Sequence, residues 1–314
     1  MEYQVHAIGI SEPNSDEGKM DLATLILIAV RISVFLSVLA MGLETTWREG
    51  TYLFRNRREL FLALLSLDVI MPAVAVAFVL FLDLQPAVKI ALVALSVSPV
   101  PAILPKKEFK AGGSREYTLG LLVFAAALSI VFVPLSMEIL EPALRIELHV
   151  PVLPVAELAL LTVLAPMVLG IAIHKLAPEF TGRVARPLAL VATLLLIVTV
   201  LPIMIFERKA ILSLIGDGTL IAMAVFVLVG LVAGHSLGGP VRENRTVLAL
   251  STATRHAGIA IAIAHANFPQ QKLALAAIGL YMIVNAIATL PYVMWTKRQQ
   301  AAQPEIDAGL HAKI

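Results

Sequence analysis

Long apolar runs alternate with short polar segments along almost the whole chain. A helix needs about 20 apolar residues to cross the hydrocarbon core of a bilayer, and nine runs approach that length. The connections between the runs are short, so the pattern predicts one all-α polytopic membrane domain over residues 22–295. The nine predicted transmembrane helices are Leu22–Leu43, Glu59–Leu82, Pro86–Leu104, Tyr117–Leu140, Pro151–His174, Ala185–Phe206, Gly216–His235, Val247–Phe268 and Leu273–Trp295.

The positive charges predict how this domain lies in the membrane. Lys and Arg collect in the cytoplasmic loops of membrane proteins. Of the 24 Lys and Arg residues, 16 fall in alternate loops and in the C-terminal segment, and 6 fall on the opposite side. Arg31 and Arg255 lie inside predicted spans. We therefore expect a multi-pass protein of the cell inner (plasma) membrane, with a polar extracytoplasmic tail over residues 1–21 and a cytoplasmic tail over residues 296–314.

Composition excludes several other classes of protein. The chain is 59% hydrophobic and 15% charged, and its mean hydropathy is +0.89, which a soluble globular enzyme does not show. The absence of cysteine excludes disulfides and thiolate metal ligands, and a net charge of +2 gives no reason to expect nucleic acid as a partner. No zinc-protease, nucleophile-elbow or P-loop motif is present. We predict no enzyme, no catalytic residue, no metal residue and no bound cofactor.

The third predicted span is interrupted by prolines. Pro99, Pro101 and Pro105 fall within seven residues, and each proline removes a backbone donor and clashes with the preceding helical turn. Broken backbone at membrane depth is tolerated only where protein or a water-filled cavity surrounds it. The segment is therefore either buried in protein beside a cavity, or an ordinary helix end near the cytoplasmic surface, since Lys106 follows at once.

The eighth predicted span carries a polar octet, Ser251–Gly258, inside an otherwise apolar run. Arg255 lies about ten residues into this span, which is about 15 Å deep and near the midplane. A charge at that depth costs at least about 2.5–3.5 kcal/mol, so it is a functional-site candidate, although a structural Arg paired to a carboxylate is the alternative. The polar residues that cluster with it as candidate site residues are Ser251, Thr252, Thr254 and His256.

Three further polar residues fall within apolar spans. Arg31 and Asp68 lie at similar depth in the first two spans, and we predict that they pair with each other. In the alternatives, Asp68 neutralises Arg255 or carries a proton. Asn285 in the ninth span needs a hydrogen-bond partner in apolar surroundings, and such residues usually join neighbouring helices.

Several stretches resemble the bile acid:sodium symporter family. They are Met41-Gly42-Leu43, Asp68-Val69-Ile70-Met71-Pro72, the segment from Pro166 to Lys175, the segment from Ser251 to Phe268 with Gly258 and Phe268 on family positions, and Asn285. Together they extend over nearly the whole of residues 22–295. The resemblance implies inverted repeats with two broken helices that cross at the midplane, surrounded by substrate and ion sites. Here those helices are the third span, broken at Pro99–Pro105, and the eighth, broken near Arg255–Gly258.

The chain departs from the family where the resemblance places the sodium ligands. The family's crossover Glu and the Gln four residues later fall on Ser251 and Arg255, its Ser-Asn pair falls on Leu104 and Pro105, and a further Gln falls on Leu67. Leucine side chains offer no oxygen to sodium, and arginine repels it. Our hypothesis is that the Arg255 guanidinium takes the place of sodium, holds the broken helices together and attracts an anionic substrate.

The sequence therefore predicts a secondary transporter of a small organic anion, working by alternating access without a requirement for sodium. Proton coupling through His256 or Asp68 is an open extension. One alternative is a sodium-coupled symporter with a relocated ion site that uses Thr118, Thr252, Thr254 and backbone carbonyls. Another is a membrane sensor on the same fold, because fold does not fix function. The expected partners are the bilayer and an organic anion, and steroids, keto acids, small carboxylates and sulfonates all fit.

Overall fold

The computed structural model describes residues 22–144, 157 and 159–311, and its regular elements in these ranges are helices, with no strand. The first half comprises α1 Leu22–Gly42, α2 Trp47–Gly50, α3 Tyr52–Arg55, α4 Arg57–Leu64, the π-helix η1 Leu65–Ile70, α5 Met71–Phe81, α6 Pro86–Val97, α7 Pro105–Lys110 and α8 Arg115–Leu144. The second half comprises the π-helix η2 Leu160–Leu164, α10 Ala165–Leu176, α11 Pro178–Phe206, α12 Arg208–Ser213, α13 Thr219–Leu237, α14 Arg242–Ala253, α15 Ala257–Asn267, α16 Leu273–Ala288 and α17 Leu290–His311. The all-helical prediction is confirmed for the described residues.

In the part of the chain that the structure describes, six helical segments are long and apolar enough to cross a membrane: Arg57–Phe81, Arg115–Pro142, Pro178–Thr199, Thr219–Leu237, Arg242–Asn267 and Leu273–Gln300. Three shorter apolar helices, Ile28–Gly42, Pro86–Val97 and Leu160–Leu176, fall on the other three predicted spans. The first part of the fifth predicted span, Pro151–His174, lies outside the described residues. The structure therefore supports a multi-pass membrane protein, whereas nine spans and inverted repeats stay predictions.

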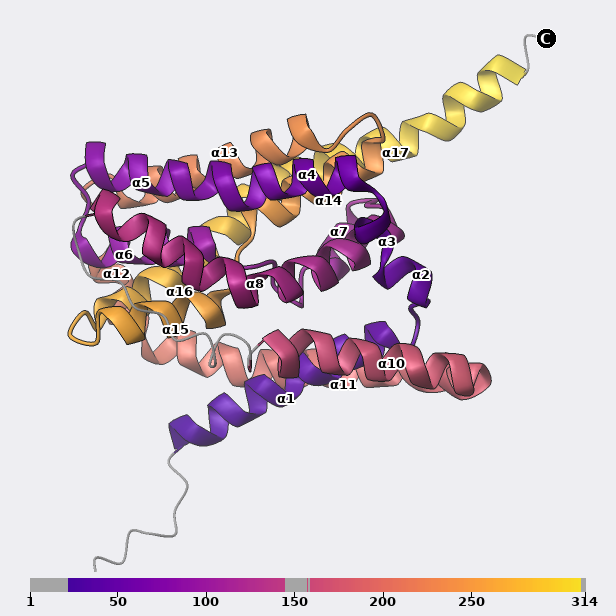
Figure 1. Ribbon diagram of the computed structural model, residues 1–314, viewed down its shortest axis with the longest axis horizontal. Coiled ribbons are helices and arrows are strands. Elements are labelled where there is room, and N and C mark those ends of the chain that lie inside the picture. The colour runs from indigo at the N-terminus through magenta and orange to yellow at the C-terminus, as the bar shows by residue number, and fades with distance from the viewer. Residues whose placement is uncertain (1–21, 145–156, 158, 312–314) are drawn as a thin grey trace, which may run out of the picture.

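Three helices form a layer of their own. Figure 1 shows α1, α10 and α11 side by side beneath the other helices, and α1 packs against both of its neighbours. Glycine allows the closest of these contacts, because a Cβ on Gly170 would lie 2.6 Å from the carbonyl carbon of Gly42. The α1 and α10 backbones therefore touch directly, as small residues permit between membrane helices.

The remaining long helices form a second, larger body that contains both of the predicted breaks. In it α13 packs closely along α14, and a Cβ on Gly234 would lie 2.5 Å from the Cα of Ala249. The α14 helix is consequently buried along most of its length; only its first turn reaches the surface. This burial explains how a helix with several polar side chains is accommodated within a largely apolar protein.

Both predicted breaks are present, with small corrections to their limits. The first non-helical segment covers residues 98–104, and Pro105 opens α7 instead of belonging to the break, because the first turn of a helix does not need the N–H that proline lacks. The second covers residues 254–256, and Gly258 lies in the first turn of α15. Residues 98–102 are buried, so the alternative of a helix end at the surface is wrong.

The end of the described chain is helical beyond the last predicted span. After a one-residue interruption at Thr289, α17 begins at Leu290 and continues past Trp295 to His311. The polar segment that follows the ninth predicted span therefore starts as a continuation of a helix.

Candidate transport site

The two breaks meet in the interior of the larger body. The backbone N–H of His256 donates a hydrogen bond of 2.9 Å to the carbonyl of Pro99. A terminal nitrogen of Arg255 donates a second, of 3.1 Å, to the carbonyl of Ser98. Broken helices expose backbone groups that need partners, and here each break supplies partners to the other. The prolines at 99 and 101 thus lie at the junction that the sequence predicted for them.

Arg255 is the bulkiest fully buried side chain among the described residues, with 1% of its surface exposed. Its second terminal nitrogen donates a bond of 2.6 Å to the carbonyl of Leu67, in η1. A π-helical turn pairs each carbonyl with the N–H five residues later, and for Leu67 that residue is Pro72, which has no N–H. The proline therefore leaves a free carbonyl for the guanidinium. Arg255, which lies in the second break, thus joins that break to η1 and to the first break.

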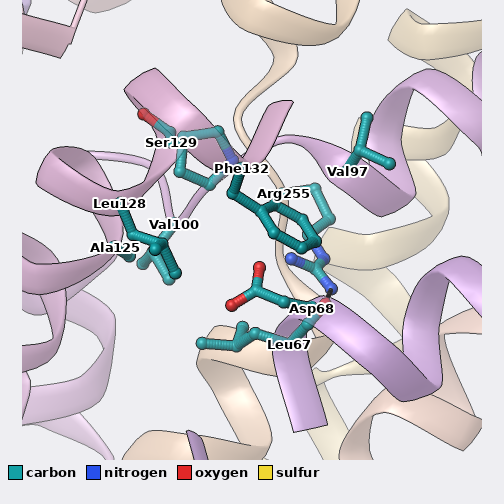
Figure 2. A pocket seen from close by; sticks show the side chains of 10 residues that line it. Leu67, Asp68, Val97, Val100, Ala125, Leu128, Ser129, Phe132 and Arg255 are labelled. Carbon is teal, nitrogen blue, oxygen red and sulfur yellow. Dashed lines mark hydrogen bonds between the residues drawn. The ribbon is translucent and has the colours of Figure 1, made fainter. Parts of the chain in front are cut away.

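One donor of Arg255 has no partner. Its Nε is buried without a hydrogen bond in the described part of the chain. The guanidinium borders a small cavity of about 10 Å³, which corresponds to about one water molecule. Figure 2 shows Arg255, Asp68 and Phe132 around it. The full lining is Leu67, Asp68, Val97, Pro99, Val100, Ala125, Leu128, Ser129, Phe132 and Arg255.

Asp68 lies at this cavity, and the predicted partnership with Arg31 is not found. Arg31 is exposed on α1, and among the described residues no ion pair joins it to Asp68. Asp68 is only partly buried and shares the cavity with Arg255. It acts on the guanidinium as a nearby negative charge, while the hydrogen bonds of Arg255 go to carbonyls. The alternative of Arg255 in contact with a carboxylate is therefore also not observed.

The other polar residues of the octet have separate partners. Thr254 donates to the side-chain oxygen of Asn285 at 3.2 Å, and the Asn285 amide donates to the carbonyl of Ala253 at 2.6 Å. Tyr281 donates to that same carbonyl at 2.7 Å. Two side chains of α16 thus satisfy the last carbonyl of α14, and Asn285 joins neighbouring helices as predicted.

Thr252 contacts a neighbouring helix, and His256 caps the helix that follows it. The Thr252 hydroxyl lies 2.7 Å from the hydroxyl of Ser66 in η1, and both residues are fully buried. The Nδ1 of His256 accepts a weak hydrogen bond of 3.4 Å from the backbone N–H of Ile259, so this side chain caps α15. A histidine cap satisfies one of the free donors of the first helical turn.

Ser251 points to a residue that the sequence analysis missed. Its hydroxyl donates a hydrogen bond of 2.6 Å to the carboxylate of Glu108, and Glu108 is 1% exposed. Glu108 falls in the basic stretch after the third predicted span, where a solvent-exposed carboxylate is the ordinary expectation. The one sequence feature that distinguishes Glu108 is its position three residues after Pro105, directly after a predicted break.

Comparison with known proteins identifies the family of the chain. A profile of the Sodium Bile acid symporter family matches residues 31–214, which is more than half of the chain and includes α6, the first break and α7. The chain belongs to this family. No curated protein sequence gives a significant match. Membership makes the chain a membrane transporter by family.

The family match ends before the second break. It includes Leu67, Leu104 and Pro105 but not Ser251 or Arg255. Those two residues are therefore interpreted from the structure. The Thr118, Thr252 and Thr254 hydroxyls of the alternative sodium site each have different surroundings: Thr118 is buried without a partner, Thr252 pairs with Ser66 and Thr254 with Asn285.

Proposed function

We propose that this member of the Sodium Bile acid symporter family carries a small organic anion across the membrane by alternating access, and that it needs no sodium because Arg255 supplies the positive charge. The observation that carries the proposal is the position of one buried guanidinium between the two broken helices, bonded to Ser98 and Leu67. A bound cation at such a junction would neutralise the same carbonyl dipoles, and a covalently attached cation does so permanently.

The remaining donor of Arg255 supports an anion as substrate. Guanidinium groups bind carboxylates and other oxyanions through charge-assisted hydrogen bonds. Each terminal nitrogen donates one hydrogen bond to the protein, Nε has no hydrogen-bond partner among the described residues, and the side chain lines the cavity. Asp68, which lines the same cavity near the guanidinium (Figure 2), opposes an anion, so binding requires that this carboxylate move away or bind a proton.

The size of the cavity supports alternating access. About 10 Å³ admits a water molecule but not an organic anion, so binding must widen the cavity. The layer of α1, α10 and α11 packs as a unit of its own beside the larger body (Figure 1). In the proposal the two bodies move relative to each other and open the cavity first to one side and then to the other, as in transporters generally.

The test is flux of radiolabelled anions into vesicles that contain the purified protein. Pyruvate and taurocholate serve as probes of the small carboxylate and steroid sulfonate classes, each in sodium and in N-methylglucamine buffer. The proposal predicts equal flux of an accepted probe in both buffers and at least about tenfold weaker apparent affinity in Arg255→Gln, because one charged hydrogen bond contributes about 1.5–3 kcal/mol. The control is Arg57→Gln, since Arg57 is exposed. Unchanged transport by Arg255→Gln would overturn the role of the guanidinium.

A sodium-coupled symporter is the second candidate, and family membership is the observation that favours it. It predicts flux that appears only in sodium and that is lost when Thr118, one of the buried hydroxyls without a hydrogen-bond partner among the described residues, is replaced by valine. The same flux assay therefore separates the two candidates.

A further inference from the structure

Glu108 is a buried carboxylate outside the cavity of Arg255. It lies on the short helix α7 between basic neighbours, yet only 1% of its surface is exposed. The proposed function makes no use of it. Buried carboxylates are rare unless they are paired with a cation or hydrogen-bonded, so its surroundings show which of these conditions holds.

The polar groups around the Glu108 side chain are hydroxyls from two other helices. Ser251 of α14 donates a hydrogen bond of 2.6 Å to its Oε1. Thr118 of α8 also acts on this carboxylate; it is 1% exposed, and its hydroxyl has no hydrogen-bond partner of good geometry within the described chain. The Glu108 carboxyl group therefore lies between three helices, and the buried hydroxyl of Thr118 remains available to accept a hydrogen bond from it.

The charged and titratable groups nearby do not neutralise Glu108. The adjacent Lys107 directs its ammonium to the hydroxyl of Thr289, and Arg115 at the start of α8 is paired with Glu49 at 3.1 Å. Tyr117 of α8 is a further titratable neighbour, and it is buried. The α14 helix presents only the hydroxyl of Ser251 to this carboxylate in the described contacts.

A carboxylate in these conditions favours its protonated form. An ionised carboxylate buried without a partner cation loses its hydration free energy, and hydrogen bonds from two hydroxyls replace only a small part of it. The carboxylate therefore takes up a proton. Burial raises the pKa of Glu108 from 4.5 to about 8, against the smaller opposing effects of Ser251, Thr118 and Lys107. The group therefore changes charge near neutral pH.

The position of Glu108 connects it to both breaks. Its helix, α7, follows the first break directly, and Ser251 lies in the last turn of α14, directly before the second break that carries Arg255. A proton on Glu108 is thus held between the same two broken elements that the guanidinium joins. Loss of that proton places an unpaired negative charge between α7 and α14, which favours separation of the two and entry of water.

We propose that Glu108 binds the proton that moves together with the anion, with the hydroxyls of Ser251 and Thr118 completing the site. The proton adds to one carboxylate oxygen, and the new O–H group can donate to the hydroxyl oxygen of Thr118 while Ser251 continues to donate to the carboxyl. One proton with one monovalent anion moves no net charge. This proposal rests on the proposed function, since it assigns the ion that is coupled to the same transport.

The first experiment detects the proton without any substrate. Infrared difference spectra of the full-length protein in lipid, recorded between pH 5 and pH 9, report the C=O band of a protonated carboxyl group. We expect a band that disappears between about pH 7 and pH 9 and that is absent from Glu108→Gln. The matched control is Glu116→Gln, which removes an exposed carboxylate on α8 and should keep the band. A band that persists in Glu108→Gln, or no band in the wild type, overturns the proposal.

The second experiment measures coupling in vesicles with pyruvate and taurocholate as probes. A vesicle interior one pH unit more alkaline than the outside supports about tenfold accumulation in a one-to-one symport. The wild type should accumulate an accepted probe, and Glu108→Gln should exchange it without accumulation. Accumulation of the probe by Glu108→Gln overturns the proposal. Flux through the wild type that does not depend on the pH gradient also overturns it. If neither probe nor any other organic anion moves, the proposed function fails, while the infrared result still decides whether Glu108 holds the proton.

Discussion

Replacement of Arg255 by methionine should destabilise the junction between the two breaks. Methionine fills part of the same volume but donates no hydrogen bond. The change removes charged hydrogen bonds of 3.1 Å to Ser98 and 2.6 Å to Leu67 and leaves two buried carbonyls without those donors. Each lost partner costs about 1–3 kcal/mol, so the two together cost about 2–6 kcal/mol.

Removal of the buried charge acts in the opposite direction and favours the stability of the variant. The variant also removes a buried charge that has no carboxylate in direct contact, and relief from that desolvation offsets part of the loss. Because both carbonyls lie at breaks, where the helix supplies no alternative donor, we expect a net loss of at least about 2 kcal/mol. At about 2–4 °C per kcal/mol for a large domain, the melting temperature should fall by roughly 4–8 °C.

The assay is thermal unfolding of the detergent-purified protein, followed by the fluorescence of its two tryptophans. The matched control is Ser129→Ala, because Ser129 borders the same cavity but its hydroxyl bonds only to Ala126 in its own helix. The control should shift the melting temperature by less than about 2 °C, equivalent to under about 1 kcal/mol. A methionine variant as stable as the wild type would refute the reasoning that the guanidinium holds the breaks together.

Three further predictions follow from the packing and the buried groups. Gly234→Val should lower stability by about 3 kcal/mol in a denaturant titration, because its Cβ meets the α14 backbone at 2.5 Å, whereas Gly182→Ala, with nothing within 4 Å, should not. Tyr281→Phe should cost about 1 kcal/mol through its lost bond to Ala253; an unchanged midpoint would contradict that bond. Because the pKa of Glu108 is raised from 4.5 to about 8 on folding, the folded protein holds a proton in this pH window that the unfolded chain releases. The free energy of unfolding should therefore fall as pH rises from 4.5 to about 8, by up to about 5 kcal/mol. Glu108→Gln should flatten this dependence of stability on pH.

The features that the sequence predicted well are those with local causes. Three prolines in seven residues interrupt a helix wherever they occur, and a polar octet with an arginine stands out in an apolar run. The breaks at residues 98–104 and 254–256 therefore fall close to their predicted places. The burial of Arg255 follows from the same local pattern, since a charge so deep in a span must face protein or water.

The features that the sequence did not predict depend on contacts between distant segments. The contact of Glu108 with Ser251 of α14 joins residues that are 143 positions apart in the sequence. The partners of Arg255 are backbone carbonyls, which have no signature in the sequence, and the free carbonyl of Leu67 depends on a π-helical turn ahead of Pro72. Arg31 is exposed on α1, and which face of α1 carries it is set by the packing of the layer.

The most direct test of the central claim is the melting temperature of the purified protein with a panel of organic anions, each in sodium and in N-methylglucamine buffer. A ligand that binds only the folded state raises this temperature. If Arg255 stands in for sodium, an accepted anion should raise it equally in both buffers, and the rise should disappear in Arg255→Gln. A rise that occurs only in sodium would contradict the account and show that an ion site persists in this chain.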